Sequence, residues 1–119
     1  HMSALPSDIN RLDRYRPRRR IVAVLARTTA VSIYEVPSGR TLRIDSISIC
    51  NVVTTTATFR IHIVAPGESA AISNAVYYNN PLRGGATILD DSTRYLTAGD
   101  RIAVHSDTAS AIAIQISPA

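Results

Sequence analysis

The chain has 119 residues, a length that fits one domain and leaves no room for a second hydrophobic core. Its 14 Ile, 9 Val and 11 Thr against 7 Leu form a strand-forming composition and argue against a helical protein. No run of 18 or more apolar residues and no signal-peptide pattern occurs, so we expect a soluble protein made in the cytoplasm.

The formal net charge of +4 lies in the N-terminal segment, residues 1–20. This segment holds six of the 13 Arg and two acidic residues, whereas the other seven Arg are balanced by seven acidic residues. Pro17 argues against a helix through the Arg cluster, and His1-Met2 has the form of a cloning remnant. We therefore expect an extended Arg-rich arm over residues 1–20 and a neutral folded domain over residues 21–119.

The first predicted strand, residues 21–27, has apolar side chains on both faces. A strand of this kind needs cover on both sides, so we expect it to contact a neighbouring subunit as well as the core. Residues 31–36 alternate in polarity and end at Pro37-Ser38-Gly39-Arg40, whose Pro and Gly favour a tight turn.

Residues 41–53 form the longest predicted strand, and its apolar residues change face midway. The two sets are Leu42 and Ile44, then Ile47 and Ile49. Because alternate residues share a face, continuous pairing would expose one of the two sets. We therefore predict a β-bulge at Asp45-Ser46 that bends the strand from one sheet towards the other. Residues 58–64 are predicted to return as its partner strand.

The least regular part of the domain is residues 69–85, where we expect one short helical turn around Ala70 to Asn74 and a brief strand at residues 76–78. Further on, Gly99 suits a positive φ and Asp100 can close the turn onto backbone amides. The last predicted elements are a strand at 86–90, a linker at 91–100 and a closing hairpin of strands at 101–106 and 110–116.

These elements amount to about eight strands at a spacing of 8–12 residues, with no long helix. That pattern is typical of sandwiches and jelly rolls. We predict an all-β fold, a single antiparallel β-sandwich that is jelly-roll-like and follows the N-terminal arm.

Four segments of the predicted sandwich carry turn and strand motifs that occur together in one family. They are residues 33–41, 47–51, 75–82 and 96–104. These segments resemble small β-sandwich structural proteins of tailed bacteriophages, in which a Tyr-x-Val-Pro-x-Gly-Arg hairpin leads into a strand and a late Leu-x-x-Gly-Asp-x-Ile motif precedes the closing hairpin. The resemblance spans residues 31–116 and implies a non-enzymatic virion protein, often a homotrimer. Such proteins are capsid decoration (cement) proteins, which bind and reinforce the head, or tail and fibre components.

The arm has three interpretations. Its Arg residues can pair with carboxylates of the major capsid protein or of another copy, neutralise nucleic-acid phosphates, or remain a solvated tail. Apolar residues interleave with the Arg residues, which favours the assembly role over the purely electrostatic one. The predicted capsid or subunit contacts are Leu5, Ile9, Leu12, Arg14, Tyr15, Arg16, Arg18, Arg19 and Arg20.

A second candidate site lies in the irregular stretch. Aromatic rings stack on sugars while amides bind hydroxyl groups, so the stretch can form a saccharide patch of a tail or fibre module. Its residues are Tyr77, Tyr78, Asn79, Asn80 and Arg83. The alternative is that the tyrosines belong to the core and that Asn80-Pro81 marks a turn.

The sequence predicts neither a catalytic site nor a metal-binding site. His105-Ser106-Asp107 has the residue types of a hydrolase triad, but neighbours on one strand point to opposite faces and cannot converge. His62 is expected on the exposed face beside Arg60, with no second His at a spacing that would share a metal. Cys50 is interpreted as a buried, inert thiol. We therefore expect no enzyme activity and no cofactor.

Overall fold

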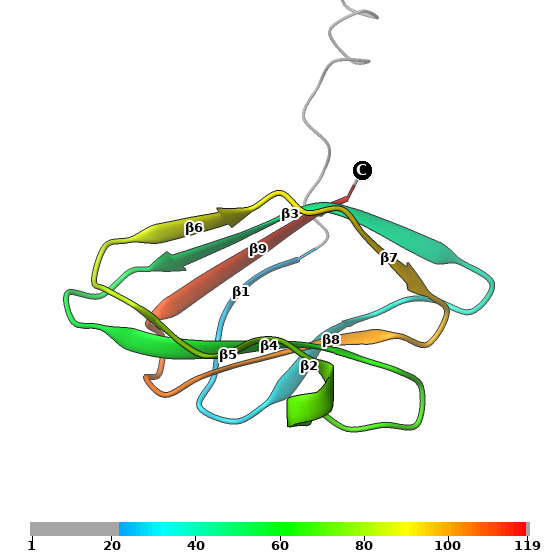
Figure 1. Cartoon of the computed structure of the whole chain (residues 1–119), viewed down its shortest axis with the longest axis horizontal. Helices are drawn as coiled ribbons and strands as arrows, with labels where there is room; N and C mark the ends of the chain where they lie inside the picture. Colours follow the sequence, from blue (N-terminus) through cyan, green and yellow to red (C-terminus); the bar gives the residue numbers. More distant parts are fainter. Residues whose placement is uncertain (1–21, 119) are drawn as a thin grey trace, which may run out of the picture.

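The computed structural model describes residues 22–118, which form nine strands and one short 3-10 helix (Figure 1). The elements are β1 (Val22–Leu25), β2 (Val31–Glu35), β3 (Thr41–Asn51), β4 (Ala57–Val64), η1 (Ile72–Asn74), β5 (Ala75–Leu82), β6 (Thr87–Asp90), β7 (Arg94–Thr97), β8 (Arg101–Ser106) and β9 (Ile112–Pro118). The predicted all-β sandwich is confirmed. The arm residues 1–20 lie outside the described residues.

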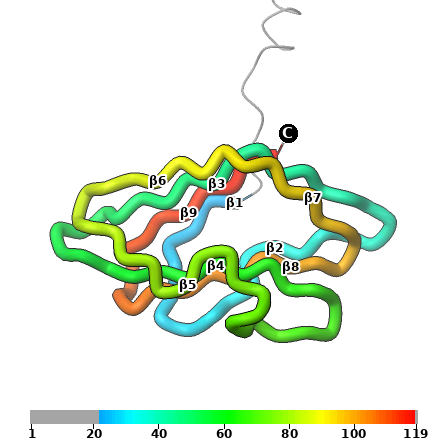
Figure 2. The backbone as a smooth tube through the Cα atoms, viewed as in Figure 1, coloured from blue at the N-terminus to red at the C-terminus, as the bar shows by residue number. Residues whose placement is uncertain are grey.

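Two antiparallel sheets face each other across the core (Figures 1 and 2). Sheet A has the order β1-β9-β3-β6, with β7 pairing the first half of β3, and sheet B has the order β2-β8-β4-β5. The pairs β1 with β9, β2 with β8, β3 with β6 and β7, and β4 with β5 are nested in the sequence. A chain folded into such nested pairs and wound into two sheets is a jelly roll.

Two pairings expected from the sequence are wrong. β3 and β4 were expected to form a hairpin, as were β8 and β9, but each pair is divided between the two sheets. The connections, residues 52–56 and 107–111, cross from one sheet to the other. The reason is physical: alternation fixes which side chains face inward, and a strand can satisfy that burial in either sheet.

The predicted bulge in β3 is present. The register against β9 shifts between Ile44 and Ser46, which leaves Asp45 as the extra residue. As a result Ile44, Ile47 and Ile49 are all buried despite their change of parity. The predicted bend towards the other sheet is wrong, because β3 pairs only with β9, β6 and β7, all in sheet A.

Branched aliphatic side chains from both sheets fill the core around Phe59. The largest fully buried side chains are Phe59, Ile44, Ile47, Ile49, Ile61, Leu96, Ile102, Ile112, Ile114, Ile116, Val36 and Val64. Their alternation along β3, β4, β8 and β9 gives each sheet one apolar face, as the sequence predicts.

Asn51, fully buried at the end of β3, fixes the arch between the sheets. Its Nδ2 donates to the carbonyl oxygens of Thr55 and Leu82, each at 2.8 Å, and its Oδ1 accepts from the Val53 amide at 3.0 Å. A buried amide with three partners is well satisfied. Asn51 therefore ties residues 52–56 to the end of β5.

Two turn predictions are confirmed. Gly39 has φ 75° in the turn after β2, where the Arg40 amide donates to Pro37 O at 3.1 Å. Gly99 has φ 87°, and Asp100 Oδ2 accepts from the Thr97 amide at 2.8 Å. The predicted helical turn is also present as η1.

Two element predictions need correction. The stretch expected as a linker contains β7, which pairs Thr41 to Ile44 of β3. β5 is longer than the predicted 76–78 strand and continues through Asn80-Pro81, which was interpreted as a turn. Proline is tolerated there because β5 is the edge strand of sheet B.

Candidate functional site

The structure divides the predicted saccharide patch between two faces. Tyr77 packs against the core with its ring centroid 5.2 Å from that of Phe59, whereas Tyr78 is 42 % exposed on the outer face of sheet B. Neighbouring residues of a strand point to opposite faces, so a single patch cannot contain both rings. Arg83 is exposed beyond the end of β5, and the Asn80 side-chain amide donates to its neighbour's carbonyl at 3.4 Å.

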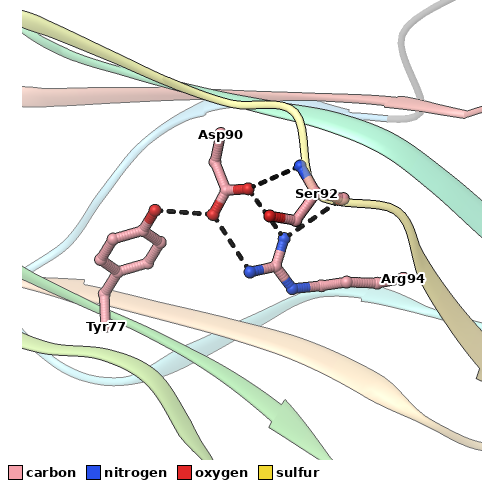
Figure 3. Close-up of polar contacts among 4 residues, drawn as sticks. All are labelled: Tyr77, Asp90, Ser92 and Arg94. Atoms are coloured by element: carbon pink, nitrogen blue, oxygen red, sulfur yellow. Dashed lines mark hydrogen bonds and ion pairs between the residues drawn. The ribbon is translucent and has the colours of Figure 1, made fainter.

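Tyr77 instead belongs to a polar cluster between the sheets, the Tyr77–Asp90–Arg94 cluster (Figure 3). The Tyr77 hydroxyl donates to Asp90 Oδ2 at 2.6 Å. Arg94 donates to both carboxylate oxygens, from Nη2 at 3.0 Å and from Nη1 at 3.2 Å, and the Ser92 amide donates to Oδ1 at 3.0 Å. The Asp90 side chain is 8 % exposed and that of Arg94 21 %.

The electrostatics of this cluster favour one protonation state. The hydrogen bond from Arg94, supported by those from Tyr77 and Ser92, holds the pKa of Asp90 well below its usual range, although burial opposes the shift. Burial, with the hydrogen bond to Asp90, raises the pKa of Tyr77 to about 12. Asp90 is therefore a carboxylate and Tyr77 a neutral donor at neutral pH.

The cluster fastens one open side of the sandwich. Tyr77 comes from β5 in sheet B, Asp90 from the end of β6 and Arg94 from the start of β7, both in sheet A. Every oxygen of the carboxylate is occupied by donors from the chain itself, so the carboxylate has no free coordination position. We interpret the cluster as a clasp between the sheets.

The triad-like residues His105, Ser106 and Asp107 serve separate structural contacts. The Ser106 hydroxyl is buried and donates to Thr58 O at 2.9 Å. Asp107 Oδ1 accepts from the Thr58 amide at 2.9 Å, and that hydrogen bond lowers the pKa of its carboxyl. His105 lies on the outer face of sheet B. Among these three residues no nucleophile is aligned with a base.

The expected exposure of His62 is wrong, because the side chain is 2 % exposed. It points outward from β4, and the segment that contains η1 lies against that strand (Figure 1). Its Nδ1 lies 3.0 Å from Ala71 O and 2.9 Å from Asn74 Oδ1. A carbonyl oxygen only accepts, so Nδ1 carries the proton and donates. His62 therefore anchors the loop before β5.

Arg60 lies on the outer surface of sheet B and was not among the site residues predicted from the sequence. It lies between β5 and β8, opposite His105. Its Nε donates to Asn79 Oδ1 at 2.7 Å, and its Cζ is 4.3 Å from the centroid of the Tyr78 ring. The alternation of Arg60 with Phe59 and Ile61 indicates its outward direction, but nothing local links it to Asn79.

The outer face of sheet A differs from that of sheet B because it has no charged residue in its central rows. The strand register aligns two rows of four residues, which we call face A. The rows are Leu25, Ala113, Cys50 and Thr87, and Ala23, Gln115, Ser48 and Leu89. Leu25 is 49 % exposed and Leu89 67 %. Cys50 is half-buried here, contrary to the expectation of a buried thiol.

A cleft lies beside face A, at the open edge between β1 and β2. It has a volume of about 440 Å³ and is lined mainly by apolar side chains. The lining residues are Val24, Leu25, Arg27, Val31, Ser32, Ile33 and Val104. Leu25 thus belongs both to face A and to this cleft.

Neither a family model nor a curated protein gives a significant match to the chain. Within residues 22–118, no group of three or more His, Cys, Asp or Glu side chains is placed to hold a metal ion. No helix in this part of the chain has the length and apolar character needed to cross a membrane. The predicted arm contacts, Leu5 to Arg20, lie outside the residues that the structure describes.

Proposed function

We propose that this chain is a non-enzymatic virion structural protein that decorates and reinforces the head of a tailed phage. The observation that carries the proposal is face A, a broad sheet surface without charge on an otherwise charge-bearing molecule. The resemblance of residues 31–116 to phage β-sandwich proteins supports it, and the jelly-roll topology is compatible with it. Fold alone does not define function, so the argument rests on the surface.

Face A has the composition of the centre of a protein interface. Interface centres are depleted of charged residues and enriched in apolar ones, whereas rims are polar. Two exposed leucines, Leu25 and Leu89, lie on opposite edge strands of the face, with uncharged side chains between them. Neighbouring strands are about 4.8 Å apart, so the four strands present a surface roughly 14 Å wide that a partner can approach closely.

The partner that we propose for face A is another copy of the chain, in a homotrimer. Strand β1 was expected to need cover on both sides, and its outward side chains Ala23 and Leu25 are exposed in the single chain. Stable interfaces bury about 20–30 residues on each side, more than the eight of face A. The apolar cleft beside Leu25 and the N-terminal arm supply further contact surface, the arm towards the capsid.

Changing both leucines of face A to arginine is expected to dissociate the trimer. Leu25→Arg with Leu89→Arg places two charges within the proposed interface, where loss of one anchor residue costs at least about 2 kcal/mol, or about 30-fold in the dissociation constant. Size-exclusion chromatography with light scattering at micromolar concentration measures the mass. The matched control is Ile72→Arg on η1, which is 74 % exposed on the side of sheet B. A monomeric wild type, or equal dissociation by the control, would count against the trimer.

Attachment to the head is tested with the arm. Deleting residues 3–20 is expected to abolish binding to phage heads, while the circular dichroism spectrum of the sandwich stays unchanged. Cryo-microscopy of virions that contain the full-length chain should show it as ordered density on the head surface. Density confined to the tail, or full head occupancy by the truncated chain, would refute the proposal.

A further inference from the structure

A second surface, on the opposite side of the sandwich from face A, has the geometry of a binding site for an anionic group. It is centred on Arg60 of β4, with Tyr78 and Asn79 of β5 on one side and His105 of β8 on the other. We call these four residues the Arg60 site. It is independent of the proposed assembly surface and of the clasp between the sheets.

A bulge in β5 builds the site. The register of β5 against β4 shifts between the pairs Phe59 with Asn80 and Ile61 with Tyr77, so that two residues, Tyr78 and Asn79, lie opposite Arg60. Asn79 has φ 51°, a left-handed conformation that is uncommon outside glycine. Bulges re-aim side chains at functional surfaces. This one directs the side-chain oxygen Oδ1 of Asn79 to Arg60 Nε.

The guanidinium of Arg60 is held in place, but most of its N–H groups have no hydrogen-bond acceptor within residues 22–118. Its Nε donates to Asn79 Oδ1 at 2.7 Å, and its Cζ lies over the Tyr78 ring. Tyr78 itself contacts the ring of the buried His62 edge-on, with centroids 6.4 Å apart. The two terminal nitrogens of Arg60 have no hydrogen-bond or ion-pair partner within residues 22–118. The four N–H groups that remain form the fork that matches a carboxylate or sulfate.

No acidic side chain within residues 22–118 forms an ion pair with Arg60. The carboxylate of Asp107, at the end of β8, already accepts from Thr58 and Thr108. The Nδ1 atom of His105 is buried and has no hydrogen-bond partner among the described residues. A ligand that reaches Arg60 meets a pre-ordered cation and a partly exposed aromatic ring. The imidazole of His105, whose Nδ1 is buried, lies beside them in the same cross-strand row.

We propose that the Arg60 site binds an acidic saccharide, with its carboxylate or sulfate on the terminal nitrogens of Arg60 and its ring beside Tyr78. The exposed part of the Tyr78 ring offers an apolar surface to a pyranose, and the Asn79 side-chain amide nitrogen, which has no partner within residues 22–118, can donate to a hydroxyl. Tyr77 and Arg83 take no part. The ordering of Arg60 before binding reduces the entropy that a ligand must overcome.

The test is a titration of the full chain, followed by NMR, with three oligosaccharides of equal length. One is sulfated and derived from heparin, one is a carboxylated galacturonate oligomer, and one is a neutral maltose oligomer. We expect resonance shifts at Arg60, Tyr78 and His105 with at least one acidic oligomer and none with the neutral one. The stronger acidic ligand identifies sulfate or carboxylate as the recognised group.

Arg60→Gln should weaken that binding by about tenfold or more, the range expected for loss of a charged hydrogen bond. The matched control is Arg83→Gln, which removes the same charge from an exposed position outside the site and should retain wild-type affinity. A two-dimensional NMR spectrum confirms that each variant is folded. Equal weakening by both variants, shifts confined to residues 11–20, equal binding of the neutral oligomer, or equal binding of a single-stranded oligonucleotide at Arg60 would each overturn the proposal.

Discussion

Asp90→Ala is expected to lower the free energy of unfolding by about 3 kcal/mol, because it leaves the guanidinium of Arg94 and the hydroxyl of Tyr77 without their shared acceptor. Removing one partner of a buried ion pair costs roughly 3–5 kcal/mol. The lower end applies here because Arg94 is 21 % exposed and water can solvate part of it. Urea denaturation followed by circular dichroism measures the change.

Asp91→Ala provides the matched control for Asp90→Ala. Asp91 is the next residue, carries the same charge and is exposed, so its replacement should change stability by less than about 0.5 kcal/mol. Tyr77→Phe, which keeps the ring and removes only the hydroxyl, should cost about 1.5 kcal/mol as the loss of one hydrogen bond to a charged group. Equal unfolding midpoints for the two Asp variants would show that the cluster does not fasten the sheets.

The same carboxylate predicts how stability depends on pH. Because folding lowers the pKa of Asp90, its contribution is fully present above the unfolded value, about 3.9. The contribution is lost as pH falls from there through the lower folded value. The difference in unfolding free energy between wild type and Asp90→Ala should therefore be constant from pH 7 to about pH 5 and shrink below about pH 4. A difference that is unchanged down to pH 2.5 would contradict the assignment of the charged form.

Local chemistry was sufficient to predict the strands and most of the turns. The change of parity in residues 41–53 predicted the bulge at Asp45, and Gly39 and Gly99 take the backbone angles that their turns require. Each of these features depends on residues within a few positions of one another. The pairing partner of each strand depends on residues far apart in the sequence. For example, β3 and β4 show the same alternation but lie in different sheets. Strand β7 escaped prediction because Leu96 is its one fully buried side chain.

The same limit applies to the candidate sites: alternation along a strand could be predicted, but contacts between distant segments could not. The division of Tyr77 from Tyr78 follows from alternation alone and was available from the sequence. The burial of His62 was not, because the cover comes from η1, about ten residues further along the chain. Likewise Asn79 reaches Arg60 only through the bulge in β5. Contacts that depend on how one strand slips against another have no signature in a single sequence.

Gly84→Ala is expected to destabilise the sandwich by about 3 kcal/mol, through a backbone contact and not through backbone conformation. Gly84 follows β5 and lies against the arch between β3 and β4, where an added Cβ would be 2.4 Å from the carbonyl carbon and oxygen of Thr54. No flexible side chain can move aside, because the contacted atoms are backbone. Overpacking of this kind costs 1–3 kcal/mol or more, and here the strain also opposes the Asn51 hydrogen bonds that hold the arch.

Substitutions at the next residue, Gly85, distinguish a steric contact from a left-handed backbone conformation as the reason for a glycine. Gly85 has φ 77°, and an added Cβ would meet no atom within 4 Å, so Gly85→Ala should cost about 1–2 kcal/mol from the left-handed conformation alone. Gly85→Asn should recover part of that loss, because Asn tolerates positive φ, whereas Gly84→Asn should be no better than Gly84→Ala. Urea midpoints of the four variants test the pattern. If Asn rescued position 84, conformation and not the approach of Thr54 would be the reason for its glycine.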